Sequence, residues 1–265
     1  MSRLLPILTG LLLLAVLADR ITRLASTSLS ASPPAAAADT ARAVAPPAAP
    51  TVGGSVALPP ISESRTPTLD RLARLAVRQQ LVRAAGSTYL DSLISTTDSV
   101  IRRWPDRNGQ ALNVMVVEGG PPGYAPKMAG LVRQALERWA QAGIGISFAE
   151  VRDSAAADIV IQWIDRFDID RAGQTDLTWD QFGRVRRATV SLALHSTAGP
   201  PLSDPALLSV AVHETGHAIG LPHSADSNDV MFPSTRTSVF SDRDVRTAQV
   251  LYQLPPGSVR DAAAH

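Results

Sequence analysis

The 265-residue chain contains no cysteine. Disulfide bonds, thiolate metal sites and thiol catalysis are therefore excluded, and any bound metal ion must be held by His, Asp or Glu. Histidine is also scarce: the chain has five, and three of them lie within the stretch 213–223. This clustering makes residues 213–223 the first candidate for a metal site.

Charge is limited as well. Charged residues make up 18% of the chain, and the formal net charge is +1. Such a balance gives no electrostatic footprint for nucleic acid or for an acidic surface, so we expect neither as a partner. Hydrophobic residues, at 45%, suffice for the core of one good-sized domain with accessory segments.

The first residues predict an export signal. Arg3 precedes an apolar run from Leu4 to Ala18. This run is shorter than the ~17–25 residues of a membrane-spanning helix and suits the apolar part of a signal peptide. We therefore expect residues 1–18 to be a signal peptide, with an uncleaved membrane anchor as the alternative. Both readings place the rest of the chain outside the cytoplasm, as a secreted, periplasmic or cell-surface protein.

Two accessory segments follow. Residues 19–67 are rich in Ala, Pro, Ser and Thr, a composition that cannot bury a core and predicts a disordered tether. Residues 68–104 carry apolar side chains at helical spacing, interrupted at Gly86, which predicts helices over 68–86 and 88–103. We favour an amphipathic helical pair packed on the main domain over a regulatory propeptide. The apolar stripe of the first helix consists of Leu69, Leu72, Leu75, Ala76 and Leu81.

From Leu112 onward, strand and helix patterns alternate. The expected strands are 112–117, 144–151, 158–163, 174–180 and 189–194, and the expected helices are 126–141, 204–220 and 241–253. The third strand is almost continuously apolar, as is typical of a strand buried on both faces. The pattern predicts an α+β domain over residues 105–255, followed by a short tail at 256–265.

The second of these helices carries the histidine cluster. His213 and His217 are four residues apart, so their imidazoles leave one helix face one turn apart. This spacing allows two nitrogens to reach one tetrahedral zinc ion at about 2.0–2.1 Å each. Glu214 projects about 100° around the helix, where its carboxylate can take a proton from a metal-bound water without being a ligand.

Both ends of this helix have sequence signals. Asp204 is the expected N-cap, with Pro205 at the first helical position. Gly220 is the expected end, because glycine accepts the left-handed conformation that turns the chain. The turn allows His223 to return as a third ligand. Three histidines leave the fourth position open, which is typical of catalytic zinc sites.

Met231 follows in the segment Asp229–Pro233. The extended histidine motif followed by such a methionine is the signature of the metzincins, and residues 210–233 resemble the matrixins, their matrix-metalloproteinase-like branch. Further similar segments are 135–139, 146–151, 157–161 and 241–245. The resemblance covers about residues 112–253.

The resemblance implies a metzincin fold: a twisted, mixed five-stranded sheet, three main helices, and a zinc cleft between an upper and a lower subdomain. It implies a zinc-dependent endopeptidase with one catalytic Zn²⁺ held by His213, His217 and His223, and with Glu214 as the catalytic base. Met231 would form an apolar floor beneath the imidazoles. Extended protein or peptide substrates would lie along the edge strand, placed at 174–180, and we expect a monomer. The alternative is a catalytically inactive zinc-binding or interaction module on the same fold.

The sequence departs from the animal matrixins in three respects. Without cysteine, the cysteine-switch propeptide is missing, and no histidine between Trp163 and Leu194 is available for a structural zinc site. His195, directly after this range, is the only spare histidine near it and is expected at the surface. A Ca²⁺ site at Asp165, Asp168 and Asp170 is weakly supported, because calcium takes about six to eight oxygens and a solvated acidic loop explains these residues better.

Overall fold

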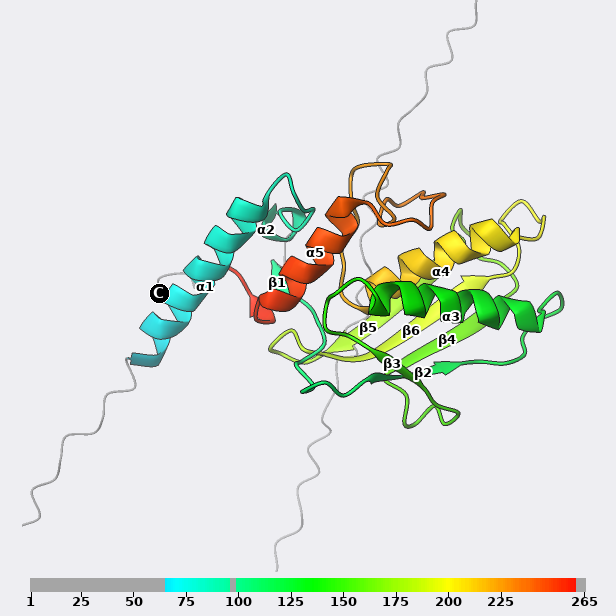
Figure 1. The fold of residues 1–265 in the computed structure, drawn as a ribbon, viewed down its shortest axis with the longest axis horizontal. Helices are drawn as coiled ribbons and strands as arrows, with labels where there is room; N and C mark the ends of the chain where they lie inside the picture. The colour runs from blue at the N-terminus through cyan, green and yellow to red at the C-terminus, as the bar shows by residue number, and fades with distance from the viewer. Residues whose placement is uncertain (1–64, 96–98, 261–265) are drawn as a thin grey trace, which may run out of the picture. The chain divides into compact units, whose positions relative to one another are not determined.

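The computed structural model describes residues 65–95 and 99–260 (Figure 1). The predictions of an export signal at 1–18 and of a tether up to residue 64 lie outside these residues, as does the end of the tail. In the part of the chain that is described, no helix has both the length and the apolar character needed to cross a membrane.

A five-stranded sheet forms the centre of the fold, with the strand order β3-β2-β4-β6-β5. Its strands are β2 (Leu112–Val116), β3 (Phe148–Glu150), β4 (Ile159–Ile164), β5 (Gly173–Trp179) and β6 (Val185–Ala193). Strand β2 is parallel to β3 and β4, β4 is parallel to β6, and β5 is the antiparallel edge strand. The expected mixed five-stranded sheet is confirmed.

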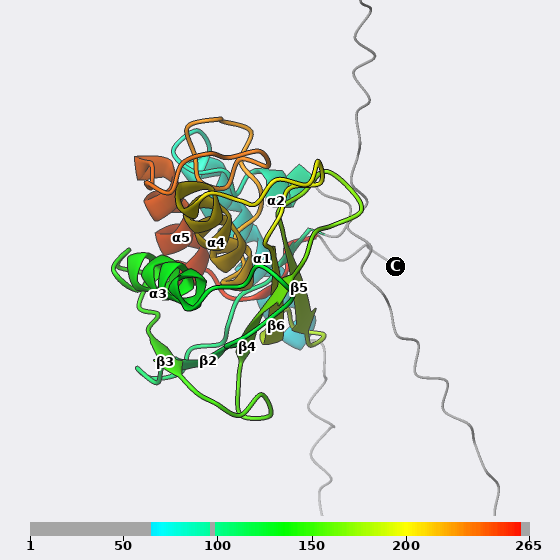
Figure 2. The ribbon, with the colours of Figure 1, turned by 90° about the vertical axis from the view of Figure 1, so that its right-hand side faces the viewer.

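Three helices lie on one side of this sheet (Figure 2): α3 (Pro126–Ala140), α4 (Asp204–Ala218) and α5 (Asp242–Gln253). Helix α3 turns one face inward, with Val132, Leu136 and Trp139 buried. Strand β4 is also buried as its apolar run predicts. Strand β3 is shorter than the expected 144–151, because Gly143 and Gly145 adopt positive φ angles of 71° and 74° and interrupt the extended chain.

The helix starts show how local the capping signals are. Helix α5 begins with a capping box between Ser241 and Asp244, at the start expected for this helix. The prediction of Asp204 as the N-cap of α4 is wrong by one residue. Ser203 is the cap, and its hydroxyl accepts a hydrogen bond from the Ala206 N–H. Asp204 instead begins the helix and forms an ion pair with Lys127.

The N-terminal segment differs most from its prediction. Helix α1 (Arg65–Ala84) forms, but its buried side chains are Val77, Leu81 and Ala84, whereas Leu72 and Leu75 of the predicted stripe are exposed. The second predicted helix, 88–103, is wrong. It is reduced to one turn, α2 (Ser92–Ser95), and the chain then enters strand β1 (Val100–Ile101), which pairs antiparallel with β7 (Gly257–Ser258).

Tertiary contacts explain why residues 99–104 are extended. The Arg103 N–H donates to the Gly183 carbonyl at 3.3 Å, and its Nε donates to the Leu254 carbonyl at 2.7 Å. The buried Trp104 donates its indole N–H to the Ala218 carbonyl at 2.9 Å. Residues 99–104 are therefore inserted between the ends of α4 and α5 and the turn before β6, and a helix there would lose these bonds.

Candidate metal centre

Helix α4 ends where the sequence predicts. Gly220 has a φ of 100°, its N–H donates to the His217 carbonyl at 2.9 Å, and the Leu221 N–H donates to the Gly216 carbonyl at 3.0 Å. This is the Schellman arrangement, in which glycine closes a helix and turns the chain. A Cβ at Gly220 would also collide with the carbonyl of Arg102. Glycine is therefore required here both by the backbone angle and by the packed N-terminal segment.

Two further carbonyls at the end of α4, those of Ala218 and Ile219, are satisfied by side chains. The Ala218 carbonyl accepts from the Trp104 indole, and the Ile219 carbonyl accepts from the Tyr252 hydroxyl at 2.8 Å. The histidine helix is thus held at its end by both the N-terminal segment and α5.

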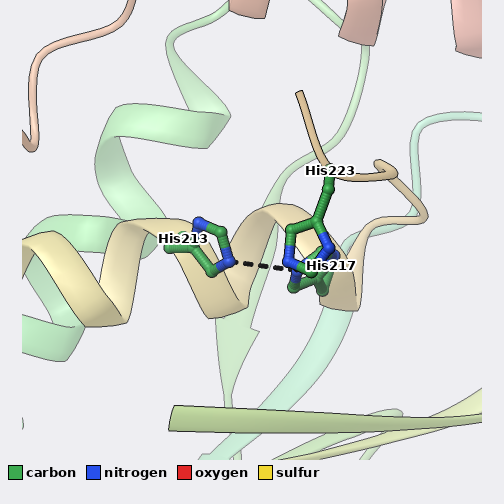
Figure 3. A group of neighbouring side chains, drawn as sticks. All are labelled: His213, His217 and His223. Atoms are coloured by element: carbon green, nitrogen blue, oxygen red, sulfur yellow. Dashed lines mark hydrogen bonds between the residues drawn. The ribbon is translucent and has the colours of Figure 1, made fainter. Parts of the chain in front are cut away.

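The turn after α4 brings His223 to the other two histidines (Figure 3). One ring nitrogen of each residue lies within 4.8 Å of those of the other two. His217 Nε2 is 3.1 Å from His213 Nε2 and 3.1 Å from His223 Nε2. The ligand set predicted from the sequence is therefore assembled in one place.

The outer nitrogens define which tautomer the first two rings adopt. His213 Nδ1 lies 2.7 Å from the Val230 carbonyl, and His217 Nδ1 lies 2.8 Å from the Leu221 carbonyl. A carbonyl only accepts, so each Nδ1 carries the proton and each Nε2 presents a lone pair. Burial lowers the pKa of His213 to about 4 and that of His217 well below 6.5, so both rings are neutral at pH 7.

These lone pairs meet at a distance that suits a metal ion. Two unprotonated nitrogens 3.1 Å apart repel each other unless a cation lies between them. Nitrogens bound at about 2.0–2.1 Å to a tetrahedral zinc ion are about 3.3 Å apart. The triad therefore fits a zinc-sized ion in both charge and spacing.

The segment around Met231 contacts both α4 and the chain next to His223. Met231 is fully buried, and its carbonyl accepts from the Ser224 N–H at 2.9 Å, next to His223. A Cβ at Gly216 would collide with the Met231 sulfur. The methionine is therefore packed against α4 at Gly216, one residue before His217.

Glu214 lies beside the triad and is not part of it. Its side chain is buried against β5, and its Oε2 accepts from the Thr175 hydroxyl at 2.6 Å. Burial raises the pKa of Glu214 to about 7, while the Thr175 hydrogen bond and the charge of Arg171 act in the opposite direction. A nearby cation would also lower this pKa. The sequence interpretation identified Glu214 but missed Thr175, whose only signal is its place on the edge strand.

The matrixin family model matches residues 121–253. The chain belongs to the matrixin family. The match contains the triad, Glu214 and Met231, and nearly coincides with the range of the resemblance seen in the sequence. This matrixin is a metalloendopeptidase with a histidine triad able to hold a metal ion, and matrixins use zinc.

The spare histidine of this matrixin lies elsewhere. His195 Nδ1 is 2.8 Å from Asp165 Oδ1, and Asp165 also pairs with Arg166. Its ring is partly exposed. The other carboxylates of the weak calcium candidate, Asp168 and Asp170, are exposed, as expected of a solvated loop.

Proposed function

We propose that this chain hydrolyses internal peptide bonds of extended protein segments outside the cytoplasm, using one zinc ion held by His213, His217 and His223. The observation that carries the proposal is the set of three converging imidazole nitrogens, those of His213 and His217 unprotonated, with a buried carboxylate next to them. Zinc, when bound, supplies Lewis-acid activation of a water molecule and of the scissile carbonyl.

Glu214 provides the proton transfers. Its carboxylate accepts a proton from the attacking water and then donates it to the leaving amine. Burial raises its pKa to about 7 in the metal-free chain, and a cation beside it lowers that pKa, which favours the ionised form that accepts the proton. Because Glu214 stands outside the ligand set, this role leaves metal binding unaffected.

Strand β5 provides the surface for the substrate. Among the described strands it pairs only with β6, so its other edge offers backbone N–H and C=O groups to an extended peptide. Thr175 of β5 contacts Glu214 directly. A peptide that adds a strand to β5 is therefore placed next to the catalytic carboxylate.

The location outside the cytoplasm rests on the apolar run from Leu4 to Ala18. We also propose that the chain acts as a monomer.

The alternative of an inactive module depends on residues 68–103 covering the cleft. Instead, the hydrogen bonds of Tyr89 and Arg103 in this segment run to Asp244 in the first turn of α5 and to the Leu254 carbonyl at its end.

The test uses the purified full chain with its zinc content measured. It is incubated with a denatured protein mixture, and the new peptide termini are identified by mass spectrometry. We expect about one zinc per chain, cleavage that a chelator abolishes, and no cleavage by Glu214→Ala with zinc retained. A zinc-loaded, folded chain that produces no new termini would refute the peptidase and leave the inactive module.

A further inference from the structure

The carboxylate of Glu214 is held by two residues of the edge strand. Its Oε2 accepts the 2.6 Å hydrogen bond from Thr175, and its other oxygen, Oε1, lies where a Cβ on Gly173 would approach to 2.5 Å. We propose that Thr175 is a positioning residue for Glu214, and that Gly173 leaves the space its carboxylate occupies. This inference rests on the proposed function and concerns how the catalytic base is oriented.

The sheet fixes these two positions. Gly173 and Thr175 are two residues apart and therefore project from the same face of β5. They pair with Leu192 and Val190 of β6, which are both buried in the core. A one-residue slip of β5 would turn the Thr175 hydroxyl to the other face. The core contacts of β6 thus determine where that hydroxyl stands.

The Thr175 hydroxyl supplies the hydrogen-bond donor that the buried Glu214 carboxylate requires. A buried carboxylate without hydrogen-bond donors is unfavourable, and a free glutamate side chain samples several rotamers. Thr175 supplies a donor with a short, branched side chain of few rotamers. Glu214 also packs against Gly173, so its carboxylate has little room to rotate. Thr175 and Gly173 together fix the orientation of the carboxylate, and Oε1 receives no hydrogen bond from Thr175.

The position of Thr175 couples the base to the substrate. The residue lies on the strand along which we propose the peptide binds. Strand β5 therefore positions both the Glu214 carboxylate and the bound peptide. A substitution of Thr175 displaces the carboxylate of Glu214 but leaves the backbone edge that binds the peptide intact. This predicts an effect on kcat with little effect on KM.

The test compares Thr175→Val, which replaces the hydroxyl with a methyl group, with Thr175→Ser, which keeps it. The matched control is Thr189→Val on β6, which pairs with the exposed Asp176. We expect Thr175→Val to lower kcat about tenfold or more with KM within roughly twofold, because it removes a hydrogen bond to a charged group. Thr175→Ser should recover most of the rate, and all three variants should keep their zinc. Thr189→Val should behave as wild type.

A Thr175→Val enzyme with wild-type kcat, or a Thr175→Ser enzyme as slow as Thr175→Val, would overturn the inference while the peptidase function stood. A second measurement is independent of activity. Melting temperatures are taken for Thr175→Val, for Glu214→Ala and for the double variant, all free of metal. The Thr175 hydroxyl also lies 3.0 Å from the Glu214 backbone carbonyl, which Glu214→Ala retains. If the contact with the carboxylate is real, the loss of melting temperature caused by Thr175→Val is therefore smaller in the Glu214→Ala background than in the wild type; an equal loss in both backgrounds refutes it, even in a chain that proves inactive.

Discussion

Tyr89 offers a sharp test of how the N-terminal segment is connected to the metal centre. Its hydroxyl donates to Asp244 Oδ1 at 3.0 Å, and both residues are buried. The other oxygen, Oδ2, accepts from the Val230 N–H at 3.0 Å and from the Ser241 N–H at 2.9 Å. The Val230 carbonyl in turn accepts from His213. Burial, followed by the charge of Asp244, holds the pKa of Tyr89 well above its usual value.

Tyr89→Phe removes this hydroxyl and little else. A hydrogen bond to a charged group contributes about 1.5–3 kcal/mol, and Asp244 Oδ1 would lose its donor from Tyr89 inside the protein. Because Oδ2 keeps its own donors, we expect a loss of about 2 kcal/mol in the free energy of unfolding. For a folded unit of this size, that corresponds to roughly 4–8 °C in melting temperature.

The assay is thermal and urea unfolding of the full chain, with zinc and with chelator, so that metal content does not confound the comparison. The matched control is Tyr124→Phe, at a half-buried tyrosine whose ring packs at a tilted angle against Trp163. We expect Tyr124→Phe to change stability by less than about 0.5 kcal/mol. If Tyr89→Phe were equally silent, the buried connection between the N-terminal segment and α5 would not stabilise the fold, and the reasoning would be refuted.

Three further predictions concern the site and the fold. Glu214→Ala should keep zinc, measured by metal analysis, and lose peptidase activity by roughly 10²–10⁴-fold, as expected for a general base; full activity would contradict its role. His213→Ala should abolish tight zinc binding, whereas His195→Ala should not, and a second zinc that depends on His195 would contradict the assignment. In the Glu214→Ala background, which removes a carboxylate whose raised pKa acts in the opposite direction over this pH range, the metal-free chain should lose stability as pH falls from about 6.5 towards 4, because the unfolded state binds a proton that the buried His213, with its pKa of about 4, does not; a melting temperature that stays constant over this range would argue against that burial effect.

The metal centre was predictable because its information is local. His213, Glu214 and His217 lie on one helix, whose period sets their directions, and Gly220 marks the turn that returns His223. Each step depends on a few neighbouring residues. The start of α5 was predictable for the same reason, because its capping box involves only Ser241 and Asp244.

The helix predicted at 88–103 failed because the deciding contacts are distant in sequence. Its periodicity is real, but Val100 and Ile101 pair with residues near the C-terminus, and Arg103 bonds to the turn before β6. The helix propensity of a segment is overridden when the extended conformation forms buried hydrogen bonds that a helix would lose. Thr175 was missed for a related reason. Its contact with Glu214 depends on the register of β5 and on the rotation of α4, and neither is encoded near Thr175.

These distant contacts bear on whether residues 65–104 are a removable inhibitor or a part of the fold. Without cysteine, no thiolate of this chain can block the metal. Leu81, Leu90, Ile101 and Trp104 are all almost completely buried. Each contributes about 1.5–3 kcal/mol, so their sum is comparable to the whole stability of ~5–15 kcal/mol typical of a domain. The Trp104 indole also donates a hydrogen bond to the Ala218 carbonyl at the end of the histidine helix, α4. Removing the segment should therefore unfold the metal centre, so that residues 105–265 show less activity and a lower melting temperature than 19–265. A folded and faster 105–265 would instead identify the segment as a propeptide.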